Sequence, residues 1–115
     1  MKNVLIIGST GQIGSELTMK LRAEYAEGNI VAGYIPSAPP TGVLAESGPS
    51  EVVDITNAKQ IAEVVDKYHI DTIYNLAALL SAVAENKPQL AWHIGIDGLM
   101  NVLEVSREKK CAVFT

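Results

Sequence analysis

Three glycines near the N-terminus have a spacing that could hold a dinucleotide. They are Gly8, Gly11 and Gly14, and they directly follow the apolar run at residues 4–7. In such a loop the first glycine permits a tight turn, the second lets the backbone approach a pyrophosphate, and the third allows close helix packing. Backbone N–H groups near Gln12 and Ile13 would face the phosphates at the positive end of a helix dipole. The pattern predicts a pyrophosphate site, with a purely structural turn as the alternative.

Sites of this kind also carry an acid about 20 residues beyond the loop, where it hydrogen-bonds the adenosine ribose. Twenty residues past Gly14 the sequence has Tyr34, and no carboxylate or arginine ends that apolar run. We therefore expect altered ribose recognition at Tyr34. Because no arginine is close enough in sequence to meet a 2′-phosphate, NAD is the expected cofactor, with NADP as the alternative.

Two further segments could line the same site. Asp54 follows a short apolar run, so its carboxylate could lie where an adenine would, or could simply flank the next helix. The run Leu76-Ala77-Ala78 ends another apolar segment with small residues, which would let the backbone pass close beneath a cofactor. Taken alone, a pair of alanines more often indicates core packing.

Strand and helix patterns alternate along the chain. Short apolar runs predict strands at 4–7, 30–32, 51–54, 72–76 and 112–114, and amphipathic patterns predict helices at about 13–25, 57–68 and 88–109. Residues 36–50, rich in proline and glycine, are expected to form a loop. This alternation predicts an α/β fold: a three-layer, Rossmann-like, doubly wound parallel sheet of about five strands, incomplete at the C-terminus.

The helix expected at 88–109 is apolar on two sides. One stripe contains Trp92, Ile96, Leu99 and Leu103, and the other contains Ala91, Ile94, Gly98, Val102 and Val105. One stripe can lie on the sheet, whereas the second needs another partner. We favour a subunit interface, and so a homodimer through 88–109, over a helix buried deeply within one chain.

Composition narrows the function classes. The chain has 115 residues, 48% hydrophobic, with 13 acidic against 9 basic residues and a net charge of -4, which disfavours nucleic-acid and anionic-membrane binding. A single cysteine, Cys111, excludes an internal disulfide and most cysteine metal sites, and no metal-ligand spacing is present. No signal peptide or membrane-spanning run is visible, so we expect one domain at 1–115 and a cytoplasmic location.

The glycine loop and three further segments resemble the extended short-chain dehydrogenase/reductase family, which includes nucleotide-sugar epimerases and dehydratases. The resemblance is closer to its L-threonine 3-dehydrogenase branch. It is carried by the runs at 11–17 (GQIGSEL), 76–82 (LAALLSA), 88–92 (PQLAW) and 98–104 (GLMNVLE), and it covers essentially the whole chain. Such enzymes use NAD to oxidise the 3-hydroxyl of L-threonine to 2-amino-3-ketobutyrate.

The resemblance implies a role for each matching residue. Pyrophosphate contacts would come from Gly8, Gly11, Gln12, Ile13 and Gly14, adenine contacts from Asp54 and Ile55, and the path towards the nicotinamide from Leu76, Ala77 and Ala78. Ser81 would lie near a small-molecule substrate, with a helix cap as the alternative. Two positions depart from the family: Tyr34 replaces its aspartate, and Gly95 replaces its usual asparagine.

The family's catalytic Ser/Thr, Tyr and Lys lie beyond the fifth strand, and none of the four tyrosines here is followed four residues later by a lysine. We therefore expect the NAD-binding portion of an oxidoreductase, with no catalytic residue within these 115 residues and no hydride transfer by the chain alone. A nucleotide-sugar epimerase or dehydratase, and a module that binds NAD(P) without turnover, are the alternatives.

Overall fold

The computed structural model describes residues 2–25, 28–37, 39–76 and 88–114. Its five strands are β1 (Asn3–Ile7), β2 (Asn29–Tyr34), β3 (Ser50–Val52), β4 (Thr72–Asn75) and β5 (Ala112–Phe114). They form one sheet in the order β3-β2-β1-β4-β5, with every neighbouring pair parallel. The helices are α1 (Gln12–Glu24), α2 (Gly42–Glu46), α3 (Ala58–Tyr68) and α5 (Pro88–Lys109).

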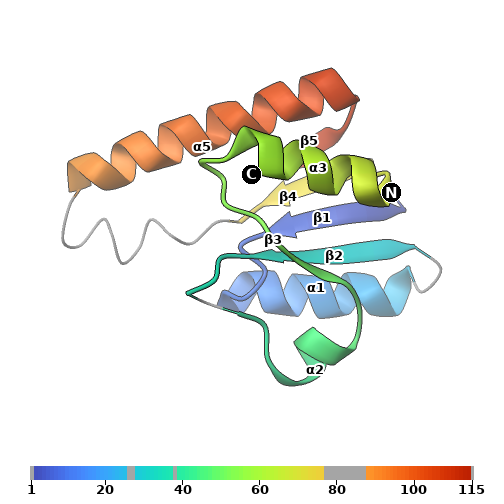
Figure 1. The fold of residues 1–115 in the computed structure, drawn as a ribbon. Helices are drawn as coiled ribbons and strands as arrows, with labels where there is room; N and C mark the ends of the chain where they lie inside the picture. Colours follow the sequence, from blue (N-terminus) through green and yellow to red (C-terminus); the bar gives the residue numbers. More distant parts are fainter. Residues whose placement is uncertain (1, 26–27, 38, 77–87, 115) are drawn as a thin grey trace.

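Helices cover both faces of the sheet, which makes the fold a three-layer α/β structure (Figure 1). On the face of α3 and α5, alternate strand residues such as Leu5, Val31 and Ile73 join the larger buried cluster. On the face of α1, Val4, Ile6 and Ile30 pack with Leu21. A strand buried on both sides reads as a continuous apolar run, which is why residues 4–7 signalled β1. The Rossmann-like, doubly wound architecture predicted from the sequence is confirmed.

The segment at 36–50 was expected to be a loop, and that prediction was wrong in one part because it contains α2. Leu44 is buried there, and α2 lies beside α1. Arg22 of α1 holds the segment by donating hydrogen bonds to the backbone oxygens of Ile30, Leu44 and Pro49 at distances of 2.7–3.1 Å. Burial lowers the pKa of Arg22 below its ordinary value. The helix depends on these long-range contacts, which a local count of prolines cannot reveal.

The two apolar stripes predicted on α5 differ in burial, in the part of that helix whose side chains the structure describes. Val102 and Val105 of one stripe are buried against the sheet and α3, whereas in the other stripe Leu99 is half-buried and Leu103 is 44% exposed. One stripe therefore packs in the core and the other faces outward. Within the described residues, no helix is long and apolar enough to cross a membrane.

Candidate functional site

The candidate site lies at the carboxyl edge of the sheet, where β1, β2, β3 and β4 all end. From β1 the chain crosses to β2 over one face, and from β3 it crosses to β4 over the other face (Figure 1). In open α/β sheets, ligands bind outside the carboxyl ends of the strands where the strand order reverses. In this sheet the strand order reverses between β1 and β4, so that position lies at the carboxyl end of β1, next to the glycine loop.

The three glycines of the loop are required for different physical reasons. Gly8 has a φ of +83°, a left-handed conformation that favours glycine. At Gly14, an added Cβ would collide with the Gly8 carbonyl oxygen and lie 2.9 Å from the Ser9 Cα, so only glycine lets α1 pack this closely. Gly11, the N-cap of α1, has φ -71° and ψ 170°, which any residue can adopt. Its lack of a side chain is therefore not a requirement of local backbone geometry, and it suits a close ligand approach.

The loop is anchored to the end of β2 at one carbonyl oxygen. Gly33 O accepts hydrogen bonds from Gly8 N at 3.2 Å, Ser9 N at 3.1 Å and Ser9 Oγ at 2.9 Å. Ser9 is completely buried, so its hydroxyl serves the loop and not a ligand. Gly33 also has little room for a side chain, since an added Cβ would lie 3.0 Å from Ile6 O. This junction fixes the glycine loop relative to the residue that follows Gly33.

The start of α1 is open to an anion. No side chain caps it, and its first turn contains no acidic residue. Helix geometry leaves the first N–H groups without intrahelical acceptors, and the dipole gives this end partial positive charge. Ile13, in the first turn, is 72% exposed, which is unusual for a large apolar side chain. This combination provides N–H donors and an apolar surface at one place.

Tyr34 is the last residue of β2 and is half-buried. Its carbonyl oxygen accepts a hydrogen bond from Val53 N at 2.8 Å. Strand alternation puts it on the α1 side, because Ile30 packs on that face and residues two and four further along share it. The structure thus brings Tyr34 to the same edge and the same face as the start of α1.

Asp54 and Ile55 lie at the end of β3 and are fixed by side chains from two helices. Asp54 N donates to Gln60 Oε1 at 2.7 Å, and Asp54 Oδ1 accepts from Thr56 N at 2.9 Å and Thr56 Oγ1 at 2.7 Å. Ile55 O accepts from Asn101 Nδ2 of α5 at 2.8 Å. The Ile55 side chain is buried against Gly98, where an added Cβ would lie 2.7 Å from Ile55 Cγ1. Only the backbone of Ile55 therefore remains for a ligand.

Leu76 follows β4 at the same edge, half-buried beside the cluster under α1, with its N–H bonded to Ile7 O at 2.8 Å. Ala77, Ala78 and Ser81, which were predicted to line the site, lie outside the described residues.

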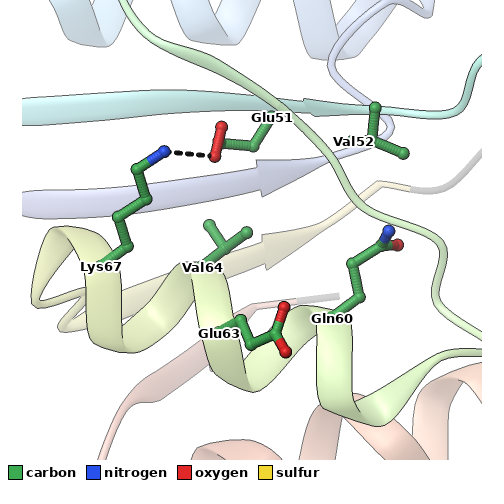
Figure 2. Close-up of a pocket in the computed structure, with 6 residues that line it drawn as sticks. All are labelled: Glu51, Val52, Gln60, Glu63, Val64 and Lys67. Atoms are coloured by element: carbon green, nitrogen blue, oxygen red, sulfur yellow. Dashed lines mark hydrogen bonds and ion pairs between the residues drawn. The ribbon is translucent and has the colours of Figure 1, made fainter.

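A separate hollow lies outside the site, between β3 and α3. It has a volume of about 420 Å³ and is lined by Glu51, Val52, Gln60, Glu63, Val64 and Lys67. Figure 2 shows the ion pair between Lys67 and Glu51, 2.9 Å long, at one end of this hollow. Gln60, one of the lining residues, also bonds to the site, through Asp54 N.

The described residues contain no group of three or more His, Cys, Asp or Glu side chains that could hold a metal ion. Cys111 is half-buried beside the larger core cluster, and its thiol donates to Ile70 O at 3.1 Å. Burial raises the pKa of this thiol, which disfavours the reactive thiolate.

Sequence reasoning missed the residues that hold the site in place: Ser9, Gly33, Gln60 and Asn101. One of them left a local signal. Asn57 and Gln60 have the spacing of a helix-capping pair, and Asn57 Oδ1 does accept from Gln60 N at 3.1 Å. The Gln60 side chain, however, bonds to Asp54 and not to the N-cap. The partners of Ser9 and Asn101 are 24 and 46 residues away, so no local pattern indicates them.

A family model described as the NAD dependent epimerase/dehydratase family matches residues 4–115. Among curated proteins, the chain is 44% identical over 115 residues to an uncharacterized epimerase/dehydratase of Staphylococcus saprophyticus, covering all of this chain and 36% of that protein. It is 40% identical, with the same coverage, to an uncharacterized epimerase/dehydratase of Staphylococcus aureus. The chain thus spans about a third of the length of these relatives.

Several solved structures are also similar to this chain. The L-threonine dehydrogenase from Clostridium difficile is 47% identical with a TM-score of 0.85, and the match covers all of this chain and 36% of that one. The holo form of a GalE-like L-threonine dehydrogenase from Cupriavidus necator is 37% identical with a TM-score of 0.85, covering 98% and 36%. The UDP-glucose 4-epimerase from Thermotoga maritima, at 21% identity, a TM-score of 0.80 and coverage of 95% and 35%, shares the fold.

Proposed function

The chain belongs to the NAD dependent epimerase/dehydratase family, and we propose that residues 1–115 are the NAD-binding part of an NAD-dependent oxidoreductase. The observation that carries the proposal is the glycine loop: Gly14 seats α1 against Gly8 and Ser9, and the first turn of α1 has no side-chain cap and no acidic residue. A loop fixed in this way leaves N–H groups pointing outward for an anion.

The residues present fit a dinucleotide in this position. The pyrophosphate would lie at Gly8, Gly11 and the first turn, with Gln12 N and Ile13 N donating to its oxygens and the exposed Ile13 side chain covering it. Gly14 would contribute by seating the helix. At the other end, Asp54 Oδ1 is occupied by Thr56, and among the described residues no hydrogen bond reaches Asp54 Oδ2. That oxygen would accept from the adenine amino group, and Ile55 N would donate to the ring.

The bound cofactor would supply a nicotinamide ring that accepts a hydride. The role proposed for this chain is to hold the dinucleotide, in which Leu76, Ala77 and Ala78 would line the path towards the nicotinamide and Ser81 would serve the substrate. The catalytic acid/base would come from the remainder of the longer protein, since the chain spans 36% of its relatives.

For the whole protein we propose oxidation of the 3-hydroxyl of L-threonine to 2-amino-3-ketobutyrate. The 47% identity to the L-threonine dehydrogenase from Clostridium difficile supports this substrate. The second candidate is a nucleotide-sugar epimerase or dehydratase, because the curated relatives at 44% and 40% identity are named as uncharacterized epimerase/dehydratases. Two assays on the full-length protein test the choice: NADH formation with L-threonine, and analysis of the sugar product after incubation with a UDP-sugar, because epimerisation or dehydration regenerates NAD and accumulates no NADH. Conversion of the sugar without threonine-dependent NADH formation contradicts the proposal.

A matched pair of variants tests the pyrophosphate site. Ile13 and Val43 are both exposed aliphatic side chains, at 72% and 64%, but only Ile13 is at the start of α1. In I13E the new carboxylate should stabilise the helix by about 0.5 kcal/mol while repelling the pyrophosphate, so NAD affinity should fall about tenfold or more. V43E should bind NAD as the native chain does.

Calorimetric titration with NAD, together with thermal unfolding, separates these effects. If I13E binds NAD as tightly as V43E, the pyrophosphate does not lie at this helix. If the folded native chain binds no NAD, the proposed function is wrong.

We further propose that the protein forms a homodimer through α5. In the part of α5 whose side chains the structure describes, Met100 and Leu103 are exposed, whereas Val102 and Val105 on the opposite face are buried. Sedimentation of the full-length protein tests this proposal, and a native monomer contradicts it.

A further inference from the structure

We propose that Tyr34 makes this site nearly indifferent to the 2′-phosphate of the dinucleotide, so that NAD and NADP bind with similar affinity. The inference rests on the proposed NAD-binding function and adds to it the specificity for the adenosine ribose. Discrimination between the two cofactors normally depends on charge at the end of the second strand. A carboxylate there accepts from the ribose hydroxyls and repels a 2′-phosphate, whereas an arginine attracts that phosphate.

The position of Tyr34 follows from the anchoring of the loop. Gly33 O accepts three hydrogen bonds from Gly8 and Ser9, which fixes the end of β2 against the loop that would hold the pyrophosphate. Tyr34 is the next residue, on the α1 side of the sheet. The ribose is joined directly to the pyrophosphate, so the side chain at 34 lies where the ribose hydroxyls must be read. A phenol can donate to or accept from a hydroxyl, but it carries no charge at neutral pH.

No cation close to Tyr34 in the sequence replaces the missing charge; the next one along the chain, Lys59, is exposed in the first turn of α3, beyond Asp54. Between Arg22 and Lys59 the sequence contains no lysine, arginine or histidine. Arg22 itself is held at the far end of α1, where its guanidinium donates to the backbone oxygens of Ile30, Leu44 and Pro49 and to Ser47 Oγ. Lys67 is paired with Glu51 in the hollow outside β3. Both cations are thus engaged by other partners, which weakens their attraction for a 2′-phosphate.

The negative charge that an acid at position 34 would supply is not replaced by a neighbouring carboxylate either. Of the acids between Gly28 and Val53, Glu51 is the partner of Lys67, and Glu46 lies on α2, which Arg22 ties to the C-terminal half of α1. Asp54 begins the next segment, and its Oδ1 is held by Thr56 while its N–H is held by Gln60. Asp54 keeps its negative charge, but these bonds hold it at the end of the site that would bind the adenine. The direct repulsion of a 2′-phosphate beside Tyr34 is thus as weak as the attraction. With both weakened, the ribose is read by neutral hydrogen bonds that tolerate either form.

The experiment compares the dissociation constants of NAD and NADP for the native protein and for Y34D, Y34F and Y25F. Y25F is the matched control, because Tyr25 ends α1 at the opposite edge of the sheet. We expect the native constants to agree within about tenfold. Y34D should tighten NAD and weaken NADP, so that their ratio shifts by about 100-fold. Y34F should leave the ratio near the native value, and Y25F should change neither constant.

A native preference of more than about 100-fold for either dinucleotide overturns the inference, and this measurement needs no variant to fold. An unchanged ratio in a folded Y34D protein overturns it as well. Failure of the proposed function gives a different result: neither dinucleotide binds the native protein or the Y25F protein.

Discussion

The two ends of the candidate site are built by different means. At the pyrophosphate end, the groups that fix the geometry are backbone atoms and glycines: Gly14 packs against Gly8 and Ser9, and three donors converge on Gly33 O. At the adenine end, side chains fix the geometry: Gln60 accepts a hydrogen bond from Asp54 N, and Asn101 donates one to Ile55 O.

The difference predicts how each end responds to change. A backbone obstacle can move only if a strand or helix moves with it, whereas a side chain can change rotamer. Substitutions at the pyrophosphate end should therefore cost more stability and more affinity than equivalent substitutions at the adenine end.

The largest effect is expected for Gly14→Ala. The added methyl group would collide with the Gly8 carbonyl and the Ser9 Cα, so α1 must shift away from the loop. We expect a loss of about 3 kcal/mol in the free energy of unfolding and loss of NAD binding. Urea denaturation and NAD titration measure both. A fully stable G14A protein that binds NAD would show that the loop is not rigid.

Gly98→Ala is the equivalent change at the adenine end. Its methyl group would meet the side chain of Ile55 and no backbone atom within 3.0 Å. Since Ile55 can rotate away and alanine favours the helix by about 1 kcal/mol, we expect a net loss of about 1 kcal/mol or less. The double variant G98A/I55V removes the Cδ1 atom but keeps a γ carbon near the added methyl group, so it should recover only part of that loss. If G98A costs as much as G14A, the contrast between backbone and side-chain obstacles is wrong.

Ser9→Ala separates positioning of the loop from general stability. Ser9 and Ser106 are both buried and each donates one hydroxyl to a backbone oxygen, Gly33 O at 2.9 Å and Val102 O at 2.7 Å. Each alanine variant should lose about 1 kcal/mol in unfolding free energy. Only S9A should also weaken NAD, by about threefold to tenfold. Equal NAD affinity in the two variants would mean that the Ser9 hydroxyl does not position the loop.

The smallest effect is expected at the opposite edge of the sheet. Partial burial of Asp71 favours its protonated form, but hydrogen bonds from Asn3 N, Thr72 Oγ1 and Lys2 N outweigh it and hold its pKa below the ordinary value. A lowered folded pKa stabilises the protein above the unfolded pKa of about 3.9, and this contribution disappears as the pH falls further.

Asp71→Asn should therefore flatten the loss of stability below about pH 4 without changing NAD affinity at neutral pH. Urea denaturation at a series of pH values measures the slope. An altered NAD affinity would show that the two edges of the sheet are coupled.

Much of the fold could be predicted because its signals are local. The buried run at 4–7, the glycines that follow it and the apolar period of α3 each report on neighbouring residues. The α2 helix could not be predicted, because it depends on Leu44 burial and on Arg22, which lies 22 residues away from Leu44. Asp54 and Tyr34 were identified from spacing, but the burial of the Ile55 side chain against Gly98 was not, because α5 is remote in sequence.

By itself, the sequence determined the α/β alternation, the glycine loop and the replacement of an acid by Tyr34, since each of these is a pattern of adjacent residue types. Only the tertiary structure decided which groups hold the site: the convergence on Gly33 O, the link from Gln60 to Asp54, and the link from Asn101 to Ile55. Hydrogen bonds are short and directional, so these links exist only once the fold has brought distant segments within about 3 Å.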